Sequence, residues 1–184
     1  MSTNTILETR SALPTGTWKL DPVHSHAAFA VEYGVGTFRG SFSPVEAKLE
    51  VTDDGRATLS GAAPVVGVKV QDENLAVHLQ SPDFFDAERT PEITFTSTAI
   101  ERSADEITIA GDLQIKGHSQ PVEARGTVTD PAEDAHGFVR FGLELRTTVD
   151  RTKFGLDWNM ELPNGQPALA NEVDLTADLY FVQE

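Results

Sequence analysis

The sequence contains no cysteine, and this absence excludes several kinds of site at once. Without thiols there is no disulfide framework, no zinc finger, no iron–sulfur cluster and no thiol nucleophile. Basic residues are also scarce, because 14 Lys and Arg stand against 29 Asp and Glu, which gives a formal net charge of −15 at pH 7. That balance repels phosphate backbones and anionic headgroups. We therefore expect no nucleic-acid partner and no electrostatic docking to a membrane.

Long apolar runs are missing as well. A membrane helix needs roughly 18 to 20 uninterrupted apolar residues, and the most apolar stretch, residues 57–70, is interrupted by Gly61, Pro64 and Gly67. The first 16 residues lack the basic start, the apolar stretch and the cleavage pattern of a secretory signal. The sequence therefore predicts no integral membrane segment and a cytoplasmic location.

Length and composition indicate one folded domain. The 184 residues suit a single core, and 39% apolar against 23% charged residues excludes wholesale disorder. We expect residues 1–16, which are mostly polar, to form a mobile tail and residues 17–184 to form the domain. No phosphate-binding loop, dinucleotide fingerprint or nucleophile elbow occurs, so no cofactor is expected.

From Ser25 onward the apolar residues recur with period two, which predicts strands. The clearest run is 139–149, where Val139, Phe141 and Leu143 alternate with polar or small residues. Eight antiparallel strands can remove their exposed edges by closing into an up-and-down barrel, with a sandwich as the alternative. The fold class predicted is thus all-β, an antiparallel eight-stranded barrel. The other seven predicted strands cover residues 27–33, 45–51, 66–70, 93–97, 107–115, 122–128 and 173–181.

The strand pattern is interrupted once, between Asp72 and Phe85, and this segment predicts one short helical element. Leu75 and Leu79 are spaced as on one face of a helix, and Ser81-Pro82 is a stop signal. We expect the element to lie across one end of the barrel.

Several motifs, in order along the chain, resemble those of the YceI-like family. The resemblance spans Trp18 to the C-terminus and implies a lipocalin-like barrel that encloses a tunnel for a long isoprenoid chain, such as a polyprenyl quinone or polyprenyl phosphate. The sequence departs from the family pattern at Leu75-Ala76, where relatives have an Arg-Asp pair, and at Tyr33, where many have His. The motifs are residues 21–25 with Phe29, then 38–42, 78–86, 91–98, 111–113 and 151–156.

The apolar strand faces can be packed core or the wall of a tunnel. Packed core is the usual interpretation of any one residue, but small residues recur on the same faces as the phenylalanines, and together with the resemblance this favours a tunnel. The small residues are Ala27, Ala47, Gly111, Ala124, Gly126 and Ala177. The inward positions of central strands predict a lining of Phe29, Val31, Phe95, Leu113, Phe141 and Leu143. The candidate ligand-binding set also includes Phe38, Phe42, Leu79, Phe84, Phe85, Phe154 and Trp158.

The titratable residues predict neither a metal site nor a catalytic site. His24 and His26 are two apart in a predicted strand, where two imidazoles can share a metal, but no third ligand is near in sequence. Because their face is opposite to that of Phe29, we expect both outside the barrel or at its mouth. Asp83 is expected to form a turn with Ser81. The remaining histidines, His78, His118 and His136, lie in separate segments.

The main hypothesis is therefore a barrel that binds or carries a long-chain isoprenoid lipid without catalysis, with a homodimer left open. One alternative is an enzyme for a small hydrophobic substrate, with His24, His26 or Asp83 as acid or base. Another is a stress-related interaction protein whose barrel is filled by its own side chains. We expect the loop at Gly155 to be structural, because glycine suits a positive φ there.

Charge separates the candidate headgroups. A diphosphate needs a cluster of Arg and Lys, whereas the basic residues are dispersed in sequence. A neutral prenyl quinone or prenyl alcohol is therefore expected to bind more tightly than the diphosphate. The basic residues considered are Arg39, Arg89, Lys116, Arg125, Arg151 and Lys153, and the neutral donors are His24, Ser25, Gln80 and Thr96.

Overall fold

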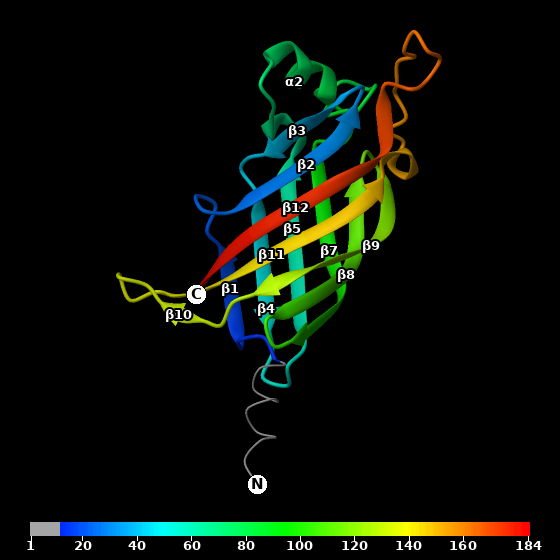
Figure 1. Ribbon diagram of the computed structural model, residues 1–184. Coiled ribbons are helices and arrows are strands. Elements are labelled where there is room, and N and C mark those ends of the chain that lie inside the picture. The colour runs from blue at the N-terminus through cyan, green and yellow to red at the C-terminus, as the bar shows by residue number, and fades with distance from the viewer. Residues whose placement is uncertain (1–11) are drawn as a thin grey trace.

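The computed structural model describes residues 12–184, which form a closed, antiparallel eight-stranded β-barrel (Figure 1). The ring closes because β12 pairs with β1 along one edge and with β11 along the other. The predicted fold class is confirmed. In ring order the strands are β1 (Gly16–Leu20), β4 (Glu46–Val51), β5 (Ala57–Pro64), β7 (Glu92–Ser103), β8 (Glu106–Ile115), β9 (His118–Val128), β11 (Val139–Asp150) and β12 (Leu169–Gln183).

The long strand β12 has two partners along one edge. Its C-terminal end pairs with β1, in the register Leu20↔Phe181, and the rest pairs with β2 (His26–Tyr33). From β2 the sheet continues through β3 (Gly36–Phe42) to β6 (Val68–Lys69). These three strands therefore extend the barrel wall at one end, as Figure 1 shows.

The membership of the ring differs from the prediction in two places. The predicted strands 27–33 and 66–70 lie in the extension, and most of the second is η1 (Val65–Gly67) and the short β6. The ring is completed by β1 and β5, which were not predicted. In β5 the inward positions include Gly61 and Ala63, so small residues hide the period-two signal.

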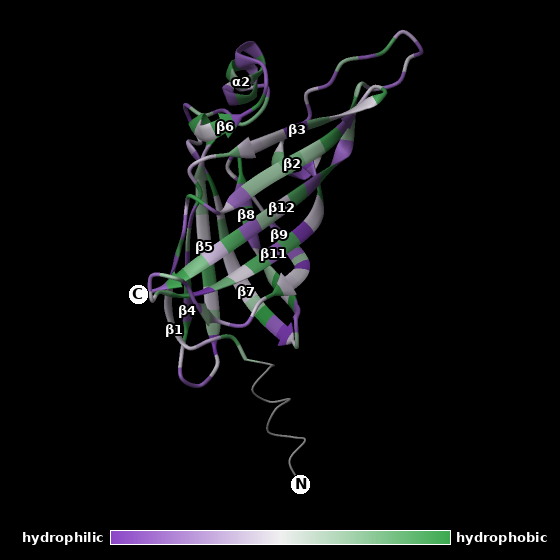
Figure 2. Ribbon diagram, turned by 60° about the vertical axis from the view of Figure 1, so that its left-hand side comes forward, coloured by the Kyte–Doolittle hydropathy of each residue, from purple (hydrophilic) through white to green (hydrophobic). Residues whose placement is uncertain are grey.

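The predicted helical element is confirmed as α2 (Glu73–Gln80), which lies across the end of the barrel that carries β2 and β3 (Figures 1 and 2). Asp72 caps its first turn, because the Asp72 carboxylate accepts a hydrogen bond of 3.0 Å from Leu75 N. Ser81 ends it and donates its hydroxyl to His78 O at 2.6 Å. Phe84 and Phe85 follow and are buried. Among the described residues no helix is long and apolar enough to cross a membrane.

Apolar residues alternate with polar ones along β11 and β12, as Figure 2 shows, and their inward side chains form two clusters. One cluster, far from α2, packs around Trp18, Phe141 and Phe181. The second lies under α2 and contains Leu79, Phe84, Phe85 and Phe154.

The last residues of the predicted mobile tail, 12–16, contact the barrel or belong to it. Residues 1–11 lie outside the described part of the chain. In the remainder, Leu13 is buried in the cluster around Trp18, Ala12 O accepts a hydrogen bond from Arg102, and Gly16 begins β1. The remaining short strand, β10 (Ala132–Glu133), pairs with the start of β11.

Candidate functional site

The barrel encloses a cavity of about 510 Å³ between the two clusters. Its wall is formed almost entirely by apolar side chains from the barrel strands, from β2 and β3, and from α2. A volume in the range of about 300 to 1,000 Å³ is typical of small-molecule sites. The interior is therefore hollow at its centre, and a barrel filled completely by its own side chains is not what the structure shows.

Most of the predicted lining residues meet in this wall. Eleven of the thirteen candidates line the cavity: Phe29, Val31, Phe38, Phe42, Leu79, Phe84, Phe85, Phe95, Leu113, Phe154 and Trp158. Several of their rings touch, as between Phe42 and Phe85, whose centroids are 5.6 Å apart. Strand period and the family motifs thus located residues of the cavity wall, and their contact with a ligand stays a prediction.

Phe141 and Leu143 lie outside the cavity, which corrects their assignment to its lining. Both side chains point inward as predicted, but they lie at a level of the barrel that other side chains fill. The ring of Phe141 stacks on Phe181 at 5.5 Å and meets Trp18 edge-on at 4.8 Å. Strand parity gives the face on which a side chain lies and not its depth along the barrel axis, so the sequence pattern could not separate these two residues from the others.

Four of the six small residues named from the sequence do leave room for the cavity: Ala27, Ala47, Ala124 and Ala177 line it. The two glycines serve other purposes. The ring of Phe95 covers Gly111, and Gly126 lies where β9 approaches β11 so closely that a Cβ atom would stand 1.6 Å from Glu144 O. Gly61, Ala62 and Ala63 of β5 also line the cavity and were missed, since β5 itself was not predicted.

At the α2 end, the cavity wall includes His78. Its Nε2 lies 3.0 Å from Asp83 Oδ2, and its ring meets the rings of Trp158 and Phe84 edge-on at 5.0 and 5.1 Å. Both partners of this pair contact solvent, with His78 34% and Asp83 56% exposed. The predicted turn at Ser81 is confirmed, because Phe84 N and Asp86 N both donate to Ser81 O.

The other histidines do not converge. His24 lies in a turn and not in a strand, which corrects its predicted placement, and its Nδ1 is 2.7 Å from Asp21 Oδ2. His26 begins β2 and is exposed, outside the cavity as expected. Within residues 12–184 no group of three or more His, Asp and Glu side chains is arranged to hold a metal ion.

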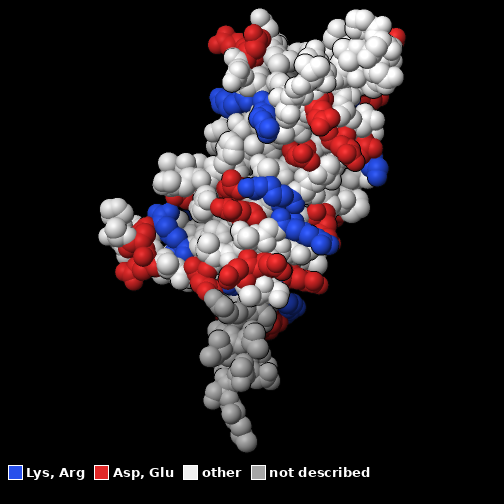
Figure 3. All heavy atoms as spheres, in the orientation of Figure 1, with Lys and Arg blue, Asp and Glu red and all other residues white. Residues whose placement is uncertain are grey.

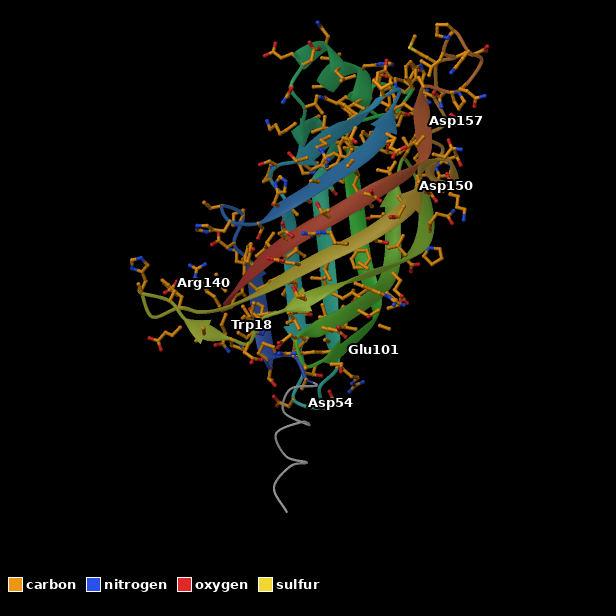
Figure 4. The ribbon with its side chains drawn as sticks, in the orientation of Figure 1. Trp18, Asp54, Glu101, Arg140, Asp150 and Asp157 are labelled. Carbon is orange, nitrogen blue, oxygen red and sulfur yellow. The ribbon has the colours of Figure 1, made fainter. Side chains whose placement is uncertain are left out.

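The loop after β11 contributes more residues to the cavity wall than the sequence predicted. Gly155 has φ +72°, which confirms the predicted positive φ, and it ends the 3₁₀ turn η2 (Arg151–Phe154). The loop was expected to be structural, with Phe154 as a candidate ligand-binding residue; Phe154 lines the cavity, and so do Arg151 and Leu156, which were not candidates. Asp150 and Asp157 flank it at the α2 end of the molecule, opposite Asp54 (Figure 4).

Arg151 is the charged residue most deeply buried in this wall, at 5% exposed. It donates from Nε to Ala170 O at 2.8 Å and from Nη1 to Leu156 O and Trp158 O at 2.5 and 2.9 Å. Its Nη2 is shielded from solvent and has no hydrogen-bond partner within residues 12–184. Burial lowers the pKa of Arg151, and the nearby carboxylates of Asp157 and Asp150 oppose that shift.

Two other basic residues meet on the outer surface. Arg39 and Lys69 line a second hollow of about 500 Å³ over β2, β3 and β6, together with His26 and Ser41. Figure 3 shows basic side chains gathered over β3. Lys69 was not among the basic residues named from the sequence. Neither Arg39 nor Lys69 lines the apolar cavity.

Comparison with known proteins settles the family. A family model described as the YceI-like domain matches residues 18–181. The chain belongs to this family. A UPF0312 protein of Staphylococcus aureus (strain USA300) is 29% identical over 168 residues, which cover 88% of this chain and 94% of that protein.

Solved structures share the fold of this YceI-like chain. Burkholderia cenocepacia BcnA superposes with a TM-score of 0.72 at 19% identity, covering 88% of this chain and 98% of that one. A polyisoprenoid-binding domain from Saccharophagus degradans, implicated in plant cell wall breakdown, superposes with a TM-score of 0.70 at 10% identity, covering 91% and 98%. At these identities the likeness concerns the barrel and not the ligand.

Proposed function

We propose that this protein binds a long-chain isoprenoid lipid, with the hydrocarbon tail in the barrel cavity and without catalysis. The observation that carries the proposal is the cavity of about 510 Å³ with an apolar wall. Each CH₂ group transferred from water into such a wall contributes about 0.8 kcal/mol, so a tail of several prenyl units supplies a large gross driving force before ordering costs. The fold shared with a polyisoprenoid-binding domain supports the same ligand class.

The composition of the wall favours a branched chain. The wall combines phenylalanine rings with small side chains such as those of Ala47, Ala124 and Ala177, and methyl branches can pack in the space that small side chains leave beside flat rings. The lower end is closed by the packed cluster around Trp18. The tail therefore ends inside the barrel, and the headgroup lies toward the α2 end.

For the headgroup, we propose a neutral or singly charged oxygen function over a diphosphate. The two arginines of the wall cannot form a cluster for two phosphates, because Arg146 is engaged with Asp178 at 2.9 Å and Arg151 is held by three backbone carbonyls. A prenyl quinone or prenyl alcohol meets this requirement. A cytoplasmic location and a homodimer remain expectations of the sequence alone.

An enzyme acting on a small hydrophobic substrate is the rival function, and His78 with Asp83 is the pair at the cavity that would have to serve it. Acid–base catalysis uses a group whose pKa is tuned and whose surroundings exclude water. The exposure of this pair argues against that role. His24 and His26, considered from the sequence, do not line the cavity.

The test is an organic extract of gently purified protein, analysed by mass spectrometry, together with a cavity-filling pair of variants. Ala124 lines the cavity, whereas Ala110 lies on the opposite face of the neighbouring strand β8. We expect a prenyl lipid in the wild-type extract, less of it in Ala124→Leu, and an unchanged amount in Ala110→Leu. An extract without lipid, combined with no binding of added prenyl alcohol, would refute the proposal, and a turned-over product would favour the enzyme.

A further inference from the structure

Arg151 belongs to the cavity wall, and the hydrogen bonds of its guanidinium are incomplete. Its guanidinium has five N–H groups, of which the one on Nε and the two on Nη1 reach the carbonyls of Ala170, Leu156 and Trp158. The two N–H groups on Nη2 have no acceptor in the described part of the chain. Buried charged donors are almost always paired, so this one requires an explanation.

The surroundings do not neutralise the guanidinium directly. Within residues 12–184 no carboxylate forms an ion pair with Arg151. Asp150, the nearest in sequence, is occupied by Thr152, which donates to Asp150 Oδ1 from its backbone N at 2.9 Å and from its hydroxyl at 2.6 Å. The three acceptors that Arg151 does have are neutral carbonyls. Asp157 and Asp150 act on Arg151 through space without an ion pair. A negatively charged acceptor oxygen would therefore complete the hydrogen bonds of Arg151 and supply the direct ion pair that it lacks among the described residues.

The position of Arg151 fits the head end of an amphiphile. It belongs to η2, and the adjoining cavity wall contains Phe154, Leu156 and Trp158 of the same loop. At the opposite end, the cavity is bounded by apolar residues such as Leu59 and Leu179, which belong to the cluster around Trp18. Figure 4 shows Asp150 and Asp157, which flank η2, far along the barrel from Trp18. A tail directed toward Trp18 brings its head to Arg151.

We propose that Nη2 of Arg151 binds the oxygen head of the lipid, and that a carboxylate head is preferred over a hydroxyl head on the same tail. This inference rests on the proposed function, since it assumes that the tail occupies the cavity. A free N–H group on Nη2 can donate to one carboxylate oxygen in a charge-assisted hydrogen bond, which is stronger than donation to a neutral carbonyl or hydroxyl oxygen. The free N–H groups do not suffice for a diphosphate, in agreement with the headgroup preference proposed above.

The experiment titrates delipidated protein with three probes that share one tail: geranylgeranoic acid, its methyl ester and geranylgeraniol. For the wild type we expect the acid to bind at least tenfold more tightly than the alcohol, which corresponds to about 1.4 kcal/mol, with the ester between them. In Arg151→Met the preference for the acid should fall to about twofold or less, while the alcohol keeps its affinity. The matched control is Lys153→Met, which removes the same charge from the exposed side of the same turn and should leave the preference unchanged.

The outcomes separate this inference from the proposed function. If all three probes bind the wild type equally, the inference is overturned and the lipid-binding proposal stands. If none of them binds, the proposed function fails, and the inference with it. If Arg151→Met does not fold, the wild-type series still decides, and nitrogen NMR of the Arg151 side chain adds a second measurement: its Nη2 protons should shift with the acid and not with the alcohol, and an equal response to both would overturn the inference.

Discussion

The ring of Phe95 lies against the backbone of Gly111 on the neighbouring strand, so closely that a Cβ atom at Gly111 would stand 2.4 Å from Phe95 Cζ. The same Cβ would be 2.5 Å from Thr96 O, a backbone atom that cannot move away on its own. The glycine thus fixes where the aromatic ring lies, and the ring in turn forms part of the cavity wall.

Gly111→Ala should therefore destabilise the protein, by about 1 to 3 kcal/mol as is typical of overpacking, and displace Phe95 into the cavity. The matched control is Gly61→Ala, since a Cβ there would lie 3.4 Å from Glu46 O, an ordinary contact. Denaturant unfolding measures the stability, and titration with a prenyl alcohol measures the binding. Equal stability of the two variants would contradict this expectation, because it would show that the Phe95 ring moves without a measurable cost.

Phe141→Trp tests the boundary between filled core and cavity. Phe141 is packed between Trp18 and Phe181, so the larger ring should cost about 1 to 3 kcal/mol of stability. Because Phe141 lies outside the cavity, the affinity for a prenyl ligand should change little, measured at a temperature where the variant is fully folded. A large loss of affinity with unchanged melting would place the tail deeper in the barrel than the cavity extends.

These two positions also show what the sequence could predict. The period-two pattern gave the fold class and the inward faces, because alternation follows directly from strand geometry. It failed for β5, whose inward positions include Gly61 and Ala63, since small residues carry little hydrophobic signal. The depth of a side chain along the barrel axis could not be predicted either. Phe95 and Phe141 follow the same pattern in sequence, and only the packing of Phe141 against Trp18 distinguishes them.

The burial of Arg151 and its carbonyl contacts could not be predicted, for a different reason. An arginine at the end of a strand is usually exposed, and nothing in the local sequence reveals that three backbone carbonyls turn toward it. Two of those carbonyls, of Leu156 and Trp158, follow the positive-φ residue Gly155, and the third belongs to Ala170 of β12. Only the folded loop brings these groups around one guanidinium.

Stability in acid should depend on Asp21. Hydrogen bonds from His24, from Val23 N and from Arg140 lower the pKa of this carboxyl from 3.8 to about 2. Since the pKa is lower in the folded state, its contribution is present above about pH 4 and is lost as the pH falls toward 2. In Asp21→Asn, melting temperature against pH should therefore be flatter over this interval than in the wild type, whereas the exposed Asp53→Asn should follow the wild type. Parallel curves for all three proteins would contradict the assignment.

The last prediction concerns Gly155, which has a φ of +72° and lies close to His118. A matched pair of variants can separate the stability cost of the positive φ from the cost of the contact with His118. Gly165 also has a positive φ, of +82°, but a Cβ there would have no atom nearer than 3.9 Å. A Cβ at Gly155 would instead stand 2.8 Å from His118 Cε1. Both Gly155→Ala and Gly165→Ala should lose about 1 to 2 kcal/mol from the left-handed backbone.

Only Gly155→Ala should lose more than this, because the His118 ring must also move. Removing that ring isolates the contact, so in the background of His118→Ala the cost of Gly155→Ala should fall toward that of Gly165→Ala. Gly155→Val should likewise reduce stability more than it changes selectivity between prenyl ligands, as urea unfolding and ligand titration would measure. If Gly155→Val changes the selectivity between prenyl ligands while its melting temperature equals that of the wild type, the loop contacts the ligand, and the expectation of a structural role is wrong.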